Sequence, residues 1–140
     1  MKQRSTKLND FGLLTIYLCS EEDIFLFKSI TERPLDVDDM TALLQAKLDK
    51  FDWKILKKEI ETQTPAYFNL PTLTYNKICD LEKKYEIKTP IKPWLLKKSN
   101  EVILKQAIQN RLEKGMTREQ ALADLKKMGF KKKELDGLTD

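Results

Sequence analysis

One lysine, one arginine and three aspartates lie close together near the start of the chain, at Lys28, Arg33, Asp36, Asp38 and Asp39. Lys28 directly follows the apolar run 24–27. An ammonium in that position either extends past its neighbours to water or stays beside them to bind an anion. The stretch therefore has two interpretations, an anion-binding lysine or two helices that meet at a charged corner.

The aspartates also have the spacing of a helix start. Asp36 and Asp39 can occupy the N-cap and the third helical position, where carboxylates are favoured by the helix dipole. Arg33 precedes them and can serve as their ion partner. The sequence thus predicts that Arg33, Asp36 and Asp39 form a mutually bonded cluster that clamps helix 20–31 onto helix 36–47.

The stretch SEEDIFLFKSITERPLDVDDMTALL, residues 20–44, resembles a pattern of nucleotidyltransferase-like proteins of the polymerase-beta superfamily. The branch concerned is the abortive-infection toxin type, the toxin half of some toxin–antitoxin pairs, with its uncharacterised archaeal relatives. A strand there leads into a helix whose lysine, arginine and two aspartates fall here on Lys28, Arg33, Asp36 and Asp39. Thr31 and Leu35 depart from the pattern, which has a small alanine and a basic residue at those positions. The segment 51–63 extends the resemblance over residues 12–63.

The catalytic signature of that superfamily is missing. It is a Gly-Ser turn followed by an Asp-x-Asp pair that binds Mg²⁺ and the triphosphate, upstream of the lysine helix. The 27 residues before Lys28 contain neither, and the Asp-x-Asp at Asp36 and Asp38 comes after the lysine. The resemblance therefore implies a non-catalytic module or fragment that binds a nucleotide or a partner protein, without a metal or cofactor.

In this interpretation Lys28 faces a nucleotide phosphate, and Arg33, Asp36 and Asp39 hold the two helices that aim it. The implied partners are a nucleotide or RNA, and a complete nucleotidyltransferase or an antitoxin. Two further interpretations come from other classes, an oligomeric structural protein without a ligand and a small basic helical protein that binds nucleic acid.

The nucleic-acid interpretation depends on a lopsided charge distribution. Residues 1–89 contain 14 basic and 15 acidic side chains, whereas residues 90–140 contain 12 and 7 and are therefore net +5. The surface would be formed by residues 90–133, with the segment KKMGFKKK at its centre. The lysines concerned are Lys126, Lys127, Lys131, Lys132 and Lys133.

Composition excludes several other classes. The chain has 140 residues, no histidine and two cysteines sixty positions apart, so it offers no histidine-based catalytic pair, zinc site or disulfide framework. The longest apolar run has four residues, and no apolar segment follows the charged N-terminus. We therefore expect a cytoplasmic protein without a membrane span. The abundance of Lys and Glu, with only four Gly, resembles thermophile proteins.

Periodicity predicts a mainly α fold, a multi-helix bundle with one short N-terminal β-strand or hairpin. The strand is expected at 12–20, in GLLTIYLCS. Ser20, Asp36, Asp52 and Thr117 are expected to cap helices, Thr117 with Gln120 in a capping box. The predicted helices span 20–31, 36–47, 52–63, 72–85, 99–115 and 117–129, with a turn at 134–138.

Two prolines in the segment 63–71 suggest a boundary between a nucleotidyltransferase-like part at 1–63 and a helical region at 64–140, which we expect to pack as one unit. The single predicted strand raises a separate question, because an isolated strand leaves its backbone groups without partners. It must pair with the residues before it, with a second copy of the chain, or with something else. A homodimer is the simplest closed solution.

Overall fold

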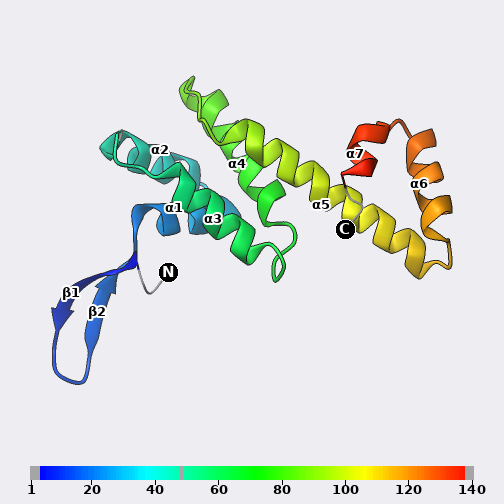
Figure 1. Cartoon of the computed structure of the whole chain (residues 1–140). Helices are drawn as coiled ribbons and strands as arrows, with labels where there is room; N and C mark the ends of the chain where they lie inside the picture. The colour runs from blue at the N-terminus through cyan, green and yellow to red at the C-terminus, as the bar shows by residue number, and fades with distance from the viewer. Residues whose placement is uncertain (1–3, 48, 138–140) are drawn as a thin grey trace.

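The computed structural model describes residues 4–47 and 49–137, whose arrangement is seen in Figure 1. In this part of the chain an antiparallel hairpin of two strands is followed by seven helices, so the predicted fold class is confirmed. None of the described helices has the length and apolar character needed to cross a membrane. The elements are β1 (Thr6–Asp10), β2 (Thr15–Leu18), α1 (Glu21–Ile30), α2 (Asp36–Ala46), α3 (Trp53–Gln63), α4 (Leu70–Tyr85), α5 (Lys92–Glu113), α6 (Arg118–Lys127) and α7 (Lys132–Asp136).

The predicted strand pairs with the residues that precede it, in a hairpin. β2 is shorter than the expected 12–20, and it pairs with β1, which is formed by the residues that precede it. The turn is closed by a hydrogen bond from Phe11 N to Leu14 O at 2.7 Å, and Gly12 has φ +82°. That left-handed backbone is the conformation that favours glycine. The hairpin extends away from the helices, with its turn farthest from them (Figure 1).

Two of the predicted helix starts near the hairpin are confirmed. The Ser20 hydroxyl accepts a hydrogen bond from Asp23 N at 3.3 Å and caps α1. The Asp52 carboxylate accepts from the first-turn N–H groups of Lys54 and Ile55 and caps α3. These caps are predictable because donor and acceptor are only two or three residues apart.

Asp36, by contrast, does not cap α2, so that prediction is wrong. Leu35 occupies the N-cap position and makes no side-chain cap, while Asp36 is the first helical residue. Its carboxylate turns back toward the preceding loop and accepts from Arg33 N at 2.8 Å and from the Thr31 hydroxyl at 2.7 Å. The Asp36 carboxylate therefore accepts from donors that precede the helix and not from the N–H groups of its first turn.

The fifth helix begins at Lys92 rather than at Ser99, so the start predicted at 99 is wrong. Pro93 lies in the first turn of α5, where the N–H that proline lacks has no helical partner anyway. Ser99 is instead buried in the middle of the helix, and its hydroxyl shares a hydrogen bond of 2.8 Å with that of Thr72 on α4.

The described residues form two hydrophobic cores. The larger one joins α1 to α4 and the first turns of α5, and consists of Phe25, Leu26, Met40, Phe51, Leu56, Ile60, Leu70, Ile78, Leu81, Ile91 and Leu95. The smaller one lies between the second half of α5, α6 and α7, and consists of Leu104, Ile108, Leu125 and Leu135. The larger core joins residues from both sides of the expected boundary at 63–71, and the two cores are arranged along α5.

The C-terminal helices follow the predicted capping pattern. Thr117 and Gln120 form the expected capping box at the start of α6. Gly129, with φ +102°, donates its N–H to Lys126 O at 3.1 Å and ends the helix as predicted. The turn expected at 134–138 is part of the short helix α7, and residues 138–140 lie outside the described residues.

Candidate functional site

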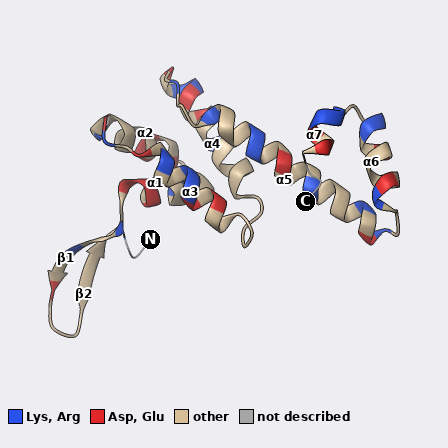
Figure 2. Cartoon of the chain, in the orientation of Figure 1, with Lys and Arg blue, Asp and Glu red and all other residues tan. Residues whose placement is uncertain are grey.

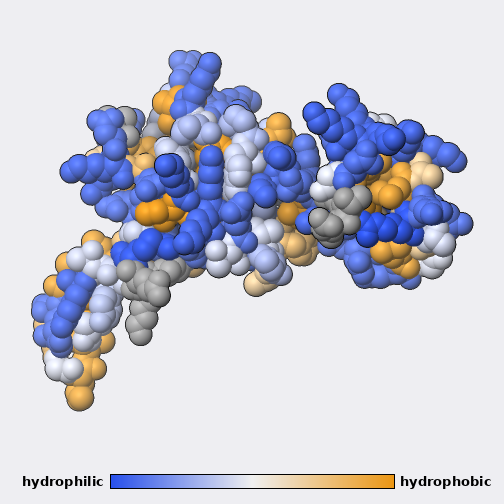
Figure 3. All heavy atoms as spheres, viewed as in Figure 1, coloured by the Kyte–Doolittle hydropathy of each residue, from blue (hydrophilic) through white to orange (hydrophobic). Residues whose placement is uncertain are grey.

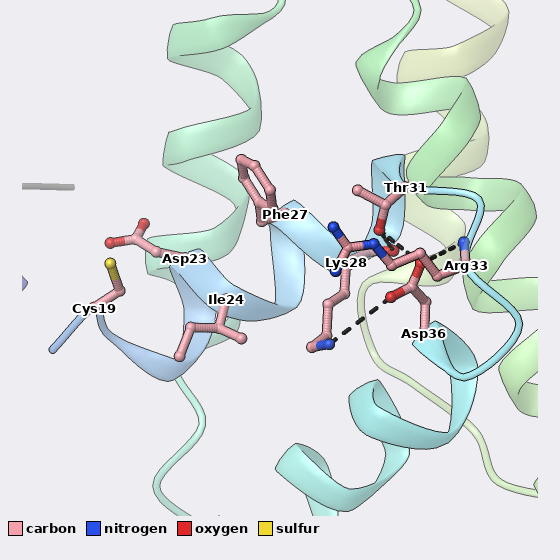
Figure 4. A pocket seen from close by; sticks show the side chains of 8 residues that line it. All are labelled: Cys19, Asp23, Ile24, Phe27, Lys28, Thr31, Arg33 and Asp36. Atoms are coloured by element: carbon pink, nitrogen blue, oxygen red, sulfur yellow. Dashed lines mark hydrogen bonds and ion pairs between the residues drawn. The ribbon is translucent and has the colours of Figure 1, made fainter.

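Lys28 is held by carboxylates of the next helix. Its ammonium nitrogen lies 2.5 Å from an oxygen of Asp39 and 3.8 Å from an oxygen of Asp36. The Lys28 side chain keeps 26% of its exposure, so it is half-buried between α1 and α2. The lysine that the sequence predicts to face a phosphate is therefore already engaged by two negative charges, of which Figure 4 shows that of Asp36.

Asp36 is the centre of this corner and is only 1% exposed. It accepts hydrogen bonds from Thr31 and from Arg33 N. The bond from Thr31 contributes most to holding the pKa of Asp36 below its ordinary value of 3.8, against the opposite effect of burial. The Arg33 N–H and the Lys28 charge lower the pKa further. Lys77 of α4 also reaches the corner and donates to Thr31 O at 2.9 Å.

Arg33 does not play the predicted part. Its side chain is exposed, and among the described residues its guanidinium forms no ion pair with Asp36 or Asp39. Arg33 contributes only its backbone N–H, and Lys28 takes the place of the ion partner. The structure thus brings together all four predicted residues of the corner, but the expected pairing of the arginine with the aspartates is wrong.

A pocket of about 330 Å³ lies on the exposed side of α1 (Figure 4). We call it the α1 pocket, and it is lined by Cys19, Asp23, Ile24, Phe27, Lys28, Thr31, Arg33 and Asp36. Its charges are largely balanced, since Lys28 is paired with aspartates and Asp23 with Arg4. Its apolar half, formed by Ile24 and Phe27 with the free Cys19 beside them, starts where β2 ends.

A second charged cluster, which no sequence pattern predicts, fixes the base of the hairpin. Arg4 donates through Nη2 to Asp23 of α1 and to Glu59 of α3, the latter at 2.7 Å. The bond to Asp23 is the main cause of a raised pKa of Arg4. Glu22 accepts from Asp52 N at 2.9 Å in the same region. Residues 4 and 59 are too far apart in sequence for spacing to reveal such a contact.

The hairpin itself, residues 6–18, carries the most exposed apolar surface near the pocket. We call it the hairpin arm, and its turn, residues 11–14, the arm tip. The large apolar side chains exposed on it are Leu8, Phe11, Leu13, Leu14, Ile16, Tyr17 and Leu18. Leu13 is fully exposed, and the hydropathy surface shows the apolar tip plainly (Figure 3). Phe27, at the pocket, is also more than half exposed.

The two faces of the arm differ. Residues that pair directly across an antiparallel ladder share a face. Lys7 lies opposite Tyr17 and Asp10 opposite Thr15, so these four form one face, on which Lys7 and Asp10 make an ion pair at 2.6 Å. Ile16 and Leu18 lie on the other face, opposite Asn9 and Thr6. That second face has no charged residue among these pairs, and its Ile16 and Leu18 are exposed.

The predicted basic surface lies at the other end of the molecule. Figure 2 shows basic residues along α7 and at the neighbouring end of α6. All five predicted lysines are exposed, and none forms an ion pair with another described residue. We call this set the basic corner: Lys126, Lys127, Lys131, Lys132 and Lys133. No group of three or more Cys, Asp or Glu side chains in the described ranges is placed to hold a metal ion.

Comparisons with protein families, with characterised proteins and with solved structures give no match for this chain. The resemblance to nucleotidyltransferase-like proteins therefore stays a prediction from residues 12–63. The surfaces with functional potential are the α1 pocket, the hairpin arm and the basic corner.

The first prediction concerns the charged corner. Asp36→Ala should lower the melting temperature by roughly 5 °C or more, because the Thr31 hydroxyl and Arg33 N–H lose a buried acceptor. Asp39→Ala is the matched control, since the Asp39 side chain is half exposed, and should cost at most about 2 °C. Thermal unfolding followed by circular dichroism measures both. Equal losses would mean that the Lys28–Asp39 contact stabilises the corner as much as the buried bonds of Asp36 do.

The second prediction concerns pH. The pKa of Asp36 is lower in the folded chain than its ordinary value of 3.8, so its ionised form stabilises the fold above that pH. This contribution is lost as the pH falls below 3.8 through the folded pKa. The difference in melting temperature between the wild type and Asp36→Asn should therefore be constant near neutral pH and shrink below about pH 4. A difference that grows on acidification would contradict the assignment.

Proposed function

We propose that this chain is a non-catalytic partner-binding module whose binding surface is the hairpin arm. The observation that carries the proposal is the concentration of exposed apolar side chains on residues 8–18, in a chain of which 34% is charged. Contiguous apolar surface of this kind marks sites of association in proteins. Residues 11–19 contain no charged side chain at all, so covering them leaves no buried charge without a partner.

The base of the arm is suited to presenting that surface. Arg4 ties the segment before β1 to both α1 and α3, and Ser20 caps α1 directly after β2. Both ends of the arm are thus attached to the helical body, while its apolar side chains extend from it. An interface gains affinity when its contact residues are held in place before binding.

Nucleotide binding at Lys28, which the resemblance implies, has weaker support. A phosphate would have to compete with Asp39 and Asp36 for the ammonium, at 2.5 and 3.8 Å. Phosphate sites usually offer several donors that are free of carboxylates. Arg33 is the only cation lining the α1 pocket without a carboxylate partner among the described residues. We therefore favour the partner-binding part of the expectation.

The partner that we propose is a second copy of this chain, forming a homodimer. In a two-fold dimer each arm contributes the same surface to the contact. A complete nucleotidyltransferase or an antitoxin, the partners implied by the resemblance, would be expected to use the same arm. The two free cysteines support placing this function in the cytoplasm, where thiols stay reduced.

The third prediction tests the arm as the binding surface. At tens of micromolar the wild type should sediment at equilibrium as a dimer, whereas Ile16→Lys should be a monomer because it places a charge on the apolar face. Ile103→Lys is a matched control, since Ile16 is 39% exposed and Ile103, on α5 outside the arm, is 46% exposed. It should leave the dimer intact. A monomeric wild type, or a dimer insensitive to Ile16→Lys, would contradict the proposal.

The basic corner supports a second candidate function, binding to nucleic acid. Its five lysines come from the end of α6 and the beginning of α7 and have no ion partner within the described ranges. Lysines that are free of carboxylates can neutralise phosphates and release their counterions. The basic corner consists of lysines alone and offers no aromatic ring on which a base could stack. Its binding to nucleic acid would therefore depend on charge.

The fourth prediction measures that binding by fluorescence anisotropy of a labelled single-stranded RNA at several salt concentrations. The wild type should bind with an affinity that falls steeply with salt. Replacing Lys131, Lys132 and Lys133 by Ala should reduce the slope of log K against log salt by about 2. Lys28→Ala should change neither affinity nor slope. Binding that depends on Lys28 and not on the basic corner would support nucleotide binding at Lys28 and contradict nucleic-acid binding by the basic corner.

A further inference from the structure

The two edges of the hairpin arm differ in how well they resist pairing. β1 carries Lys7 and Asp10, and its register shifts at a bulge between Lys7 and Asn9. Charged side chains and bulges are the features by which proteins protect an edge strand from pairing with another chain. β2, with the sequence TIYL, has no charge and no proline, and its register is regular. The outer edge of β2 is therefore the one open to another strand.

A second copy of β2 fits this edge with both faces matched. In a two-fold antiparallel pair the axis is perpendicular to the sheet, so residues of the same face lie opposite each other. Centring the axis on Tyr17 places the two tyrosines opposite each other. Ile16 of each copy then lies opposite Leu18 of the other, and Thr15 of each copy lies opposite Cys19 of the other. All four apolar side chains come together on one face, and such cross-strand pairs stabilise a sheet.

The same register decides where the arm tip goes. If Tyr17 pairs with itself, Leu14 lies opposite Ser20 of the second copy, at the beginning of its α1. The tip residues Phe11, Leu13 and Leu14 are thereby brought toward the start of that α1, where the apolar half of the α1 pocket, lined by Ile24 and Phe27, begins. Each chain offers an exposed apolar tip and an apolar pocket beside the base of its arm. The pairing supplies both with an occupant.

The exposed apolar surface of the arm is comparable in size with the surface that a standard interface buries. At roughly 200 Å² for a fully exposed large side chain, the seven apolar residues of the arm and Phe27 together expose on the order of 1,000 Å². A standard protein interface buries about 800 Å² on each partner. No charged side chain is needed in the paired segment, which agrees with the absence of charge from residues 11–19.

We infer that two copies of this chain exchange their hairpin arms, pairing β2 with β2 about an axis at Tyr17 and placing each arm tip in the α1 pocket of the other copy. This inference rests on the proposed function and adds the pairing edge, the register and the occupant of the pocket. The α1 pocket is then a receptor for an apolar segment of the second copy.

The fifth prediction tests the register by cross-linking. In a background of Cys19→Ser and Cys79→Ser, Tyr17→Cys should form a disulfide-linked dimer when oxidised with diamide, because residues on the axis are within disulfide reach. Lys7→Cys is the matched control, since residue 7 pairs with Tyr17 on the same face but lies on β1. It should not cross-link, because β2 separates β1 from the axis and the two copies of residue 7 lie on the outer strands of the paired sheet. Gels run without reductant give the yield.

A mixing experiment tests the tip and the pocket. Leu13→Lys and Phe27→Asp alter exposed residues, and each alone should weaken the dimer about tenfold or more, because both tip contacts are disrupted. An equimolar mixture should recover a heterodimer. One tip contact in it is native, and in the other the introduced ammonium meets the introduced carboxylate. Sedimentation of the mixture and of each variant alone gives the recovery.

The outcomes separate the inference from the proposed function. A dimer that depends on Ile16, but cross-links at Lys7→Cys and not at Tyr17→Cys, would overturn the register and leave the arm as the binding surface. Cross-linking at Tyr17→Cys without recovery in the mixture would overturn the placement of the tip. A wild-type chain that stays monomeric at tens of micromolar would overturn both.

Discussion

Burial of carboxylates is the constraint on which the arrangement around α1 depends. Glu22, Asp23 and Asp36 are almost completely buried, and a buried carboxylate is costly unless donors surround it. The donors come from different segments. Asp52 N, at the start of α3, binds Glu22; Arg4 binds Asp23; and Thr31 and Arg33, in the α1–α2 loop, bind Asp36. These three acids therefore fix how the hairpin arm, α2 and α3 are placed around α1.

The features that could be predicted from sequence are those decided within a few residues. Ser20, Asp52 and Thr117 cap helices because their acceptors reach N–H groups two or three positions away. Asp36 has the same local signature, but donors on its other side bind it, and only the fold of the loop reveals them. The start of α5 was obscured because Pro93 is compatible with both a linker and a first helical turn.

The sequence predicts which residues meet at the charged corner but not which of them form ion pairs. Lys28, Arg33, Asp36 and Asp39 do meet at one corner, because two short helices joined by a tight loop must bring them together. Which cation takes the aspartates depends on side-chain direction, and Lys28 on α1 faces α2 whereas the Arg33 side chain is exposed. The apolar arm was visible as a strand, but its partner strand TKLND has too few apolar residues to be recognised. The Arg4–Glu59 contact has no local signal.

The placement of two cores along α5 has a consequence for the order in which the fold comes apart. α5 is 22 residues long, and its first turns belong to the larger core while Leu104 and Ile108 belong to the smaller one. The smaller core has four buried residues, so separating α6 and α7 from α5 exposes little apolar surface and leaves the larger core intact. Regions with few buried contacts open at a free energy below that of global unfolding. We therefore expect α6 and α7 to detach from α5 at a lower free energy than the arm and its helical base need to unfold.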